Sequence, residues 1–154
     1  MNLLPNLAVL SLLTTGLASA AGGEVDILTA KDLQAESQKL SKKGGPFASQ
    51  ELKRYGNHYT MLAHREKTGS SEVHEHEADF FVVEDGEATL MTGGKLVNPK
   101  TEKPGELRGT SLSGAERHAL STGDIVHIPA GTPHQLLLDK GKPFTYFVVK
   151  VTGQ

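Results

Sequence analysis

The segment from Gly69 to Gly86, GSSEVHEHEADFFVVEDG, places the strongest constraint on the fold and on the chemistry of this chain. If its first half is a strand, alternate side chains point to opposite faces, so His74 and His76 should share one face. Asp79 follows three residues later and could supply an oxygen. Imidazole is a common metal ligand, so the segment predicts a metal site, with an isolated histidine pair that binds nothing as the alternative.

The second half of this segment is apolar, and a second segment with a turn-and-strand pattern lies further along the chain. The run from Phe80 to Val83 predicts a strand that is buried on both faces, and Asp85-Gly86 predicts a tight turn after it. From Gly123 to Leu138 the sequence reads GDIVHIPAGTPHQLLL. It predicts a turn, a short apolar strand, a Pro-Ala-Gly turn and a further strand that begins near His134.

Together the two segments resemble the two sequence motifs of the cupin superfamily, G-x5-H-x-H-x3,4-E-x6-G and G-x5-P-x-G-x2-H-x3-N. The second motif fits from Gly123 through Pro129 and Gly131 to His134, with Leu138 in place of the asparagine. The resemblance covers roughly residues 69–138, with both motifs in the family's order.

The first motif fits less closely. His74 and His76 match, and Gly86 lies at the expected distance from Asp79. Gly69 is one residue too close to His74, an aspartate replaces the glutamate, and the spacing before it is shorter. These departures leave the role of the aspartate open.

The resemblance implies a jelly-roll barrel that binds one divalent transition metal through His74, His76 and His134. If Asp79 reaches the metal, the site has three nitrogens and one oxygen. If it does not, water fills the gap and Asp79 orients a histidine. Such ligands suit Mn, Fe, Co, Ni, Cu and Zn, so the identity of the metal stays open.

Strand parity also predicts the surroundings of the site. His134 shares a strand face with Leu136 and Leu138, and Asp79 shares one with Phe81 and Val83. The expected apolar wall of the pocket is therefore Phe81, Val83, Leu136 and Leu138, with His127 either lining the pocket or packing beside it. The opposite parity set, Phe80, Val82 and Leu137, should face outward, where a second layer or a second subunit of a homodimer would cover it.

Other charged residues near the motifs have ordinary explanations. His58, His64 and His118 lie outside both motifs and are not expected at the site. A solvated strand edge explains the three glutamates that flank the histidines, which are Glu72, Glu75 and Glu77.

The N-terminus predicts export. Residues 1–20 carry no charged side chain, Leu7 to Leu17 form a short apolar core, and Ala18-Ser19-Ala20 has the form of a cleavage site. We interpret 1–20 as a secretory signal peptide that is cleaved near Ala20-Ala21, giving a periplasmic or secreted protein. A buried helix is the alternative, because no Lys or Arg precedes the apolar core.

The rest of the chain predicts a peripheral helix and an all-β domain. Thr29 and Asp32 resemble a capping box before a helix over 30–43, within an N-terminal extension of residues 21–50. Strands are expected at 51–55, 58–66, 87–92, 117–121 and 144–151, with a strand pair and an irregular loop around 98–109 between the motifs. The expected cupin β-barrel domain spans 51–154.

Composition excludes several classes of function. Cysteine is absent and the formal net charge is −2, so disulfides cannot support the fold and nothing favours nucleic acid or an anionic membrane. The sequence contains no recognisable nucleophile or phosphate-binding loop. Two hypotheses remain for the function: a metal-dependent enzyme acting on a small organic molecule, by dioxygenase-like, lyase or isomerase chemistry, or a non-catalytic module that binds a small ligand or sugar.

Overall fold

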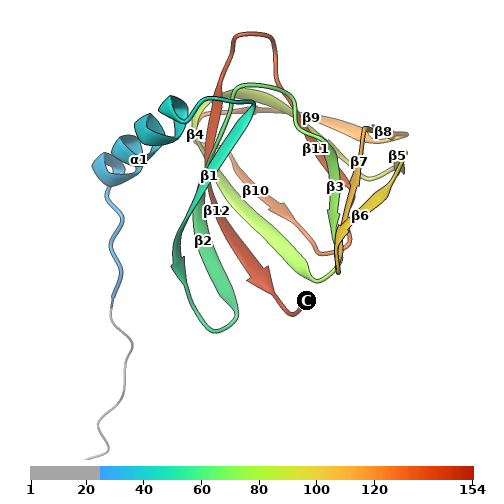
Figure 1. The fold of residues 1–154 in the computed structure, drawn as a ribbon, viewed down its shortest axis with the longest axis horizontal. Helices are drawn as coiled ribbons and strands as arrows, with labels where there is room; N and C mark the ends of the chain where they lie inside the picture. The colour runs from blue at the N-terminus through green and yellow to red at the C-terminus, as the bar shows by residue number, and fades with distance from the viewer. Residues whose placement is uncertain (1–24) are drawn as a thin grey trace, which may run out of the picture.

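The computed structural model describes residues 25–154, so the predicted signal peptide lies outside the described part of the chain. In this described part, one helix, α1 (Ala30–Lys42), is followed by strands that curl into a barrel (Figure 1). The strands are β1 (Phe47–Arg54), β2 (His58–Arg65), β3 (Ser71–His74), β4 (Glu77–Thr92), β5 (Lys95–Val97), β6 (Lys100–Lys103), β7 (Glu106–Gly109), β8 (Ser111–Ser113), β9 (Glu116–Ser121), β10 (Ile125–Ile128), β11 (His134–Leu137) and β12 (Phe144–Thr152). The predicted all-β jelly-roll barrel with a short N-terminal helix is confirmed, although its first strand starts before residue 51.

All strand pairs are antiparallel, and β4 connects the two halves of the barrel. The strands follow the order β1-β2-β12-β4-β11-β3-β7-β6, and β9 and β10 also pair with β4. The first part of β4 pairs with β12 and β10, and its last part pairs with β11 and β9. This topology places the two sequence motifs next to each other, because β3 and β4 both pair with β11.

The turn predicted at Asp85-Gly86 is wrong, because β4 continues through it as one strand of 16 residues. Gly86 has a φ of 91°, a left-handed conformation that glycine adopts without strain. A Cβ atom there would overlap the backbone carbonyl of Pro143. The register with β12 also shifts between Thr145 and Tyr146, so Gly86 marks the bend at which β4 passes from one half of the barrel to the other.

The region between the motifs is more regular than predicted. In place of an irregular loop over 98–109, β6 and β7 form a hairpin, and β7 also pairs with β3. The pairing sets Glu106 opposite His74 and Arg108 opposite Glu72. A segment without an obvious strand pattern therefore supplies charged residues to the interior of the barrel.

The interior wall is apolar in its middle and aromatic at one end. Phe81, Val83 and Leu90 of β4 are buried there with Tyr146 and Val148 of β12. The rings of Phe81 and Tyr146 lie 5.2 Å apart in a tilted arrangement, a favourable geometry for aromatic side chains. These inward residues alternate with outward ones along each strand, as the pleat requires.

Helix α1 packs on the outside of the barrel, as predicted. The side chain of Thr29 accepts from the backbone N–H of Asp32, and the Asp32 carboxylate accepts from the Thr29 backbone, which completes the capping box. Leu40 is only 1% exposed, and the helix lies against β1 and β2. Within residues 25–154 no helix is both long enough and apolar enough to cross a membrane.

The outer face of β4 and β10 stays accessible. Phe80 is 41% exposed and Ile125 is 65% exposed, whereas Val82 and Leu137 are partly buried. The outward direction predicted for Phe80 and Val82 agrees with these exposures.

Candidate metal centre

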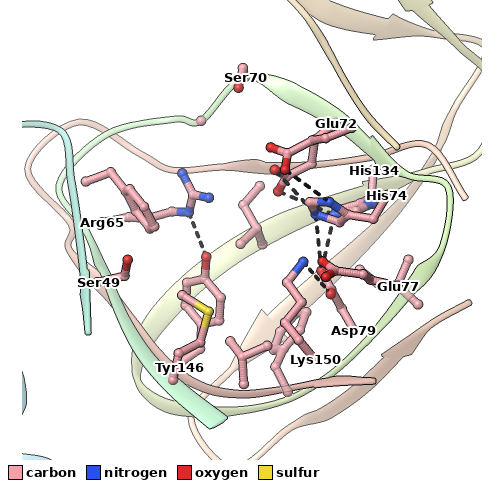
Figure 2. A pocket seen from close by; sticks show the side chains of 18 of the residues that line it. Ser49, Arg65, Ser70, Glu72, His74, Glu77, Asp79, His134, Tyr146 and Lys150 are labelled. Atoms are coloured by element: carbon pink, nitrogen blue, oxygen red, sulfur yellow. Dashed lines mark hydrogen bonds and ion pairs between the residues drawn. The ribbon is translucent and has the colours of Figure 1, made fainter. Parts of the chain in front are cut away.

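A cavity of about 670 Å³ occupies the inside of the barrel, and its lining differs from one end to the other. Histidine and carboxylate side chains gather at one end around His74, and Arg65 and Tyr146 lie at the other (Figure 2). Apolar side chains, including those of Phe81 and Leu136, line the stretch between them. The size is typical of cavities that hold small organic ligands.

Cross-strand pairing assembles the polar end. Glu72 of β3 lies directly opposite His134 of β11, and His74 lies opposite Glu106 of β7. Glu72 and His74 are two residues apart on one short strand, so both side chains point into the barrel. Asp79 reaches the same place from β4, where its side chain is also buried.

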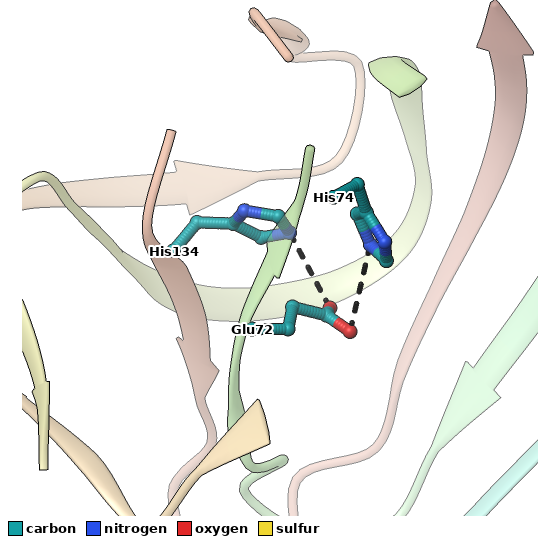
Figure 3. Close-up of side chains that lie close together, drawn as sticks. All are labelled: Glu72, His74 and His134. Carbon is teal, nitrogen blue, oxygen red and sulfur yellow. Dashed lines mark ion pairs between the residues drawn. The ribbon is translucent and has the colours of Figure 1, made fainter. Parts of the chain in front are cut away.

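Two imidazoles and two carboxylates face one another here. The Nε2 atom of His134 lies 3.4 Å from Oε1 of Glu72 and 3.6 Å from Oδ2 of Asp79. The Nε2 atom of His74 lies 3.6 Å from Oε2 of Glu72 and 3.7 Å from Oδ2 of Asp79. Figure 3 shows Glu72 placed between the two histidines.

The tautomer of His134 is set by its backbone contact. Its Nδ1 lies 2.9 Å from the carbonyl oxygen of Thr132, which can only accept, so Nδ1 carries a proton. In the neutral ring Nε2 then has a free lone pair directed at two carboxylates. Such a contact is repulsive unless a proton or a metal cation lies between the groups.

Basic side chains surround the carboxylates. The guanidinium of Arg108 forms ion pairs with both Glu72 and Glu106, and its Nε donates to Glu106 over 2.8 Å. Lys103 contacts the same Glu106 carboxylate at 3.0 Å. Glu106 in turn lies 3.9 Å from Nδ1 of His74, a position from which it can orient that ring.

Lys150 contributes a buried ammonium group on the opposite side. It lies directly across from Asp79 in the pairing of β12 with β4, and its Nζ is 2.5 Å from Asp79 Oδ1. That oxygen is fully buried and makes no hydrogen bond of good geometry within the described residues. The Asp79 carboxylate can therefore accept one more interaction here, in addition to its contact with Lys150.

Burial and neighbouring charges favour the metal-binding states of Glu72 and His74. Burial alone would raise the pKa of Glu72, but His134 and Arg108 outweigh it and hold that pKa well below its usual range. Burial, assisted by the charge of Lys150, lowers the pKa of His74 and favours its neutral form. An ionised carboxylate and a neutral imidazole are the forms that bind metal.

The structure brings together only part of the predicted ligand set. His74, Asp79 and His134 converge, but β3 ends at His74, and His76 lies exposed in the bend before β4. The assumption of one continuous strand through both histidines is wrong, so the parity argument does not extend to His76.

Glu72 occupies the place that was predicted for His76. Its side chain is 13% exposed, so the interpretation as part of a solvated strand edge is wrong. The signal was present in the sequence, because the parity that was used to pair His74 with His76 also pairs His74 with Glu72. Glu106 and Arg108 carried no comparable signal.

The predicted pocket residues are distributed between the cavity and its surroundings. Phe81 and Leu136 line the cavity. Val83 is buried in the core, and Leu138 is partly buried against that core. His127 is exposed, and its ring lies 6.4 Å from that of Phe80 on the outer face, so the structure does not bring it to the cavity.

Solved structures with the same architecture place the fold in a known class. A protein with a double-stranded β-helix domain from Klebsiella pneumoniae matches 85% of this chain and 93% of its own length, with a TM-score of 0.58 and 18% identity. A cupin-2 domain protein from Rhodospirillum rubrum matches 69% of this chain and 60% of its own, with a TM-score of 0.51 and 14% identity. The chain has the cupin fold. A Thermus thermophilus protein matches 75% of this chain and 92% of its own length, with a TM-score of 0.54 and 18% identity.

No protein-family model and no curated protein matches the sequence. The function of the cupin barrel must therefore be argued from its own residues.

The donor set fits a divalent transition metal. Ligand atoms about 2.1 Å from a tetrahedral metal lie about 3.4 Å from one another. The four contacts between the imidazole nitrogens and the carboxylate oxygens span 3.4–3.7 Å, close to that value. Glu72, His74 and His134 each offer one donor atom within 4.8 Å of the other two, and Asp79 lies beside them. Nitrogen and oxygen donors of this kind suit the same range of metals that the resemblance implies.

Proposed function

We propose that this cupin barrel is a metal-dependent enzyme that acts on a small organic molecule by lyase or isomerase chemistry. The observation that carries the proposal is the buried group of Glu72, His74 and His134, with Asp79 beside it, at one end of a cavity large enough for a substrate. His74, His134, Glu72 and Asp79 would hold the metal. Bound there, a divalent metal polarises a carbonyl or hydroxyl oxygen of the substrate.

The residues around the site suit proton transfer. Lys150 Nζ is buried next to the ligand group, and its contact with Asp79 Oδ1 orients the ammonium toward the cavity. A proton on Nζ can be donated to a substrate atom that gains negative charge. Apolar side chains such as Phe81 and Leu136 line the adjacent stretch of the cavity, and a low local polarity strengthens electrostatic interactions of this kind.

Proton transfer distinguishes this proposal from oxidative cleavage, the most concrete activity expected from the resemblance. A dioxygenase also needs open coordination positions and an apolar wall, and this cavity offers an apolar wall. Lys150 favours lyase or isomerase chemistry, because dioxygen chemistry does not require a buried ammonium group beside the ligands. Oxygen consumption decides between the two.

The test uses protein purified without a histidine tag, as wild type, His134→Ala and His118→Ala. Elemental analysis should find about one transition metal per chain in the wild type and in His118→Ala, and far less in His134→Ala. Each protein is then incubated with hydroxy acids, keto acids and diketones in deuterated water. NMR spectroscopy follows turnover and deuterium incorporation, and an oxygen electrode runs in parallel.

Metal-dependent turnover or exchange without oxygen consumption, lost in His134→Ala and in Lys150→Met, supports the proposal. Oxygen consumption that persists in Lys150→Met assigns dioxygenase chemistry instead. Stoichiometric metal without any turnover favours the non-catalytic binding module, and a wild type that binds no metal removes the basis of the proposal.

A further inference from the structure

Arg65 is a buried cation that has no acidic partner among residues 25–154. It lies at the end of β2, its residue is only 8% exposed, and its side chain lines the cavity. Four cationic side chains line this cavity, and the other three, Lys103, Arg108 and Lys150, form ion pairs with carboxylates. Within residues 25–154 no carboxylate lies within ion-pair distance of Arg65.

Neighbouring side chains hold the guanidinium in place without neutralising it. Its Nε donates to the hydroxyl oxygen of Tyr146 over 3.0 Å. The ring of Phe47 covers one face, with its centre 4.4 Å from the guanidinium carbon. Stacking and one hydrogen bond offset only part of the cost of burying a charge, so the group still lacks an anionic partner.

The loop beside Arg65 packs directly on its guanidinium. Gly69 approaches Nη1 so closely that a Cβ atom at this position would overlap it. The loop is fixed, because Gln135 donates to the carbonyl of Gly69 over 2.8 Å and the Gly69 N–H donates to Leu136. Ser49 places a further hydroxyl group at the same end of the cavity (Figure 2).

The donors that remain free match a carboxylate. Because Nε is occupied by Tyr146, the two terminal nitrogens of Arg65 form a fork that can donate to both oxygens of one carboxylate. Burial raises the pKa of Tyr146, so its hydroxyl keeps a proton. That proton has no acceptor within the described residues, and it can be donated to the same anion.

We propose that Arg65 and Tyr146 form a carboxylate-binding subsite, so that the ligand of this cavity is a small organic acid. Tyr146 and Lys150 are four residues apart on β12, about 13 Å along the strand. The molecule therefore places its carboxylate at Arg65, an apolar segment against Phe81 and Leu136, and a hydroxyl or carbonyl oxygen at the histidine end. Only this last contact rests on the proposed function; the carboxylate contact does not need the metal.

The test measures binding of hexanoate, butyrate, benzoate and inorganic phosphate to chelator-treated protein by calorimetry and NMR titration. Hexanamide, which has the shape of hexanoate without its charge, is the matched control ligand. Wild type should bind hexanoate and not hexanamide. Arg65→Met should weaken hexanoate binding by about 30-fold or more, since it removes one partner of a buried charge pair. Arg117→Met, which changes an exposed arginine outside the cavity, should leave it unchanged.

Arg65→Lys covers the case in which Arg65→Met does not fold, because it keeps the charge and loses the fork. It should bind hexanoate several-fold more weakly, and Tyr146→Phe should also weaken the binding. Unchanged affinity in Arg65→Lys overturns the subsite, as does a wild type that binds none of the carboxylates. Tighter binding of phosphate than of any carboxylate also overturns the assignment to an organic acid.

The His74→Ala, His134→Ala double variant separates the two proposals. It should lose the metal and keep its affinity for hexanoate. Binding of hexanoate that requires added Zn²⁺ and is insensitive to Arg65→Met places the carboxylate on the metal and overturns the subsite. Absence of metal in the wild type overturns the proposed function and leaves the subsite standing.

Discussion

The substitution Glu72→Gln tests the ligand assignment where structure and sequence disagree. Glutamine keeps the shape of the side chain but removes the negative charge from a group that faces both histidines at 3.4–3.6 Å. We expect Zn²⁺ binding to weaken by about 100-fold. Substitution of the exposed His76 by alanine should change it by less than about twofold.

The magnitude follows from the number of donors. Structural zinc sites with four ligands bind with about 10–16 kcal/mol, so each ligand accounts for about 2.5–4 kcal/mol, or about 10²–10³-fold in affinity. The amide oxygen of glutamine can still approach the metal, which places the expected loss at the lower end of this range. Arg108 keeps Glu106 as a partner, so Glu72→Gln should leave the barrel folded.

The assay is competition for Zn²⁺ between the protein and a chromophoric chelator near neutral pH. His74→Ala serves as the reference for loss of a ligand, and His118→Ala as the control for loss of a histidine outside the site. Circular dichroism and thermal unfolding confirm that each variant is folded. If His76→Ala weakened binding as much as His74→Ala while Glu72→Gln had no effect, the ligand set derived from the structure would be refuted.

Three further predictions concern other parts of the chain. Asp79→Ala should weaken Zn²⁺ binding as much as His134→Ala, because Asp79 Oδ2 lies 3.6–3.7 Å from both imidazole nitrogens; a loss of less than about tenfold in the same competition assay would place Asp79 outside the ligand set. The apolar face that exposes Phe80 and Ile125 should support a homodimer. Light scattering at tens of micromolar, an order-of-magnitude working range, should detect this dimer in wild type and a monomer in Phe80→Asp, and a monomeric wild type would contradict the expectation. N-terminal sequencing of protein from the native host should begin at Ala21, and an intact Met1 would argue against a cleaved signal.

Local sequence was sufficient wherever a few adjacent residues determine the structure. The capping box of Thr29 and Asp32 predicted the start of α1, because both partners of its hydrogen bonds lie within one turn. The pattern Gly-Asp, Pro-Ala-Gly and His134 predicted a strand that begins at the histidine, and β11 begins there. The hairpin of β1 and β2 and the strand β12 were predicted for the same reason.

Strand parity predicted which residues share a face, but only the tertiary structure decided how far each strand extends. His76 lies outside the site because β3, and with it the pairing to β7, ends at His74. Gly86 was read as a turn, although the left-handed conformation of a glycine serves equally well at a bend within one long strand. Both corrections depend on the strands that lie alongside, which are distant in the sequence.

The burial of charge was the property that the sequence determined least. Glu72 is charged and stands in a polar stretch of the sequence, so its own segment indicates a surface position, and it faces the two histidines because β11 and β7 enclose β3. In the sequence Arg65 has the pattern of an ordinary polar residue at the end of a strand. In the structure Phe47 stacks on its guanidinium and Tyr146 accepts its hydrogen bond. Burying such groups is unfavourable unless partners from other strands compensate, and those partners come together only when the barrel closes.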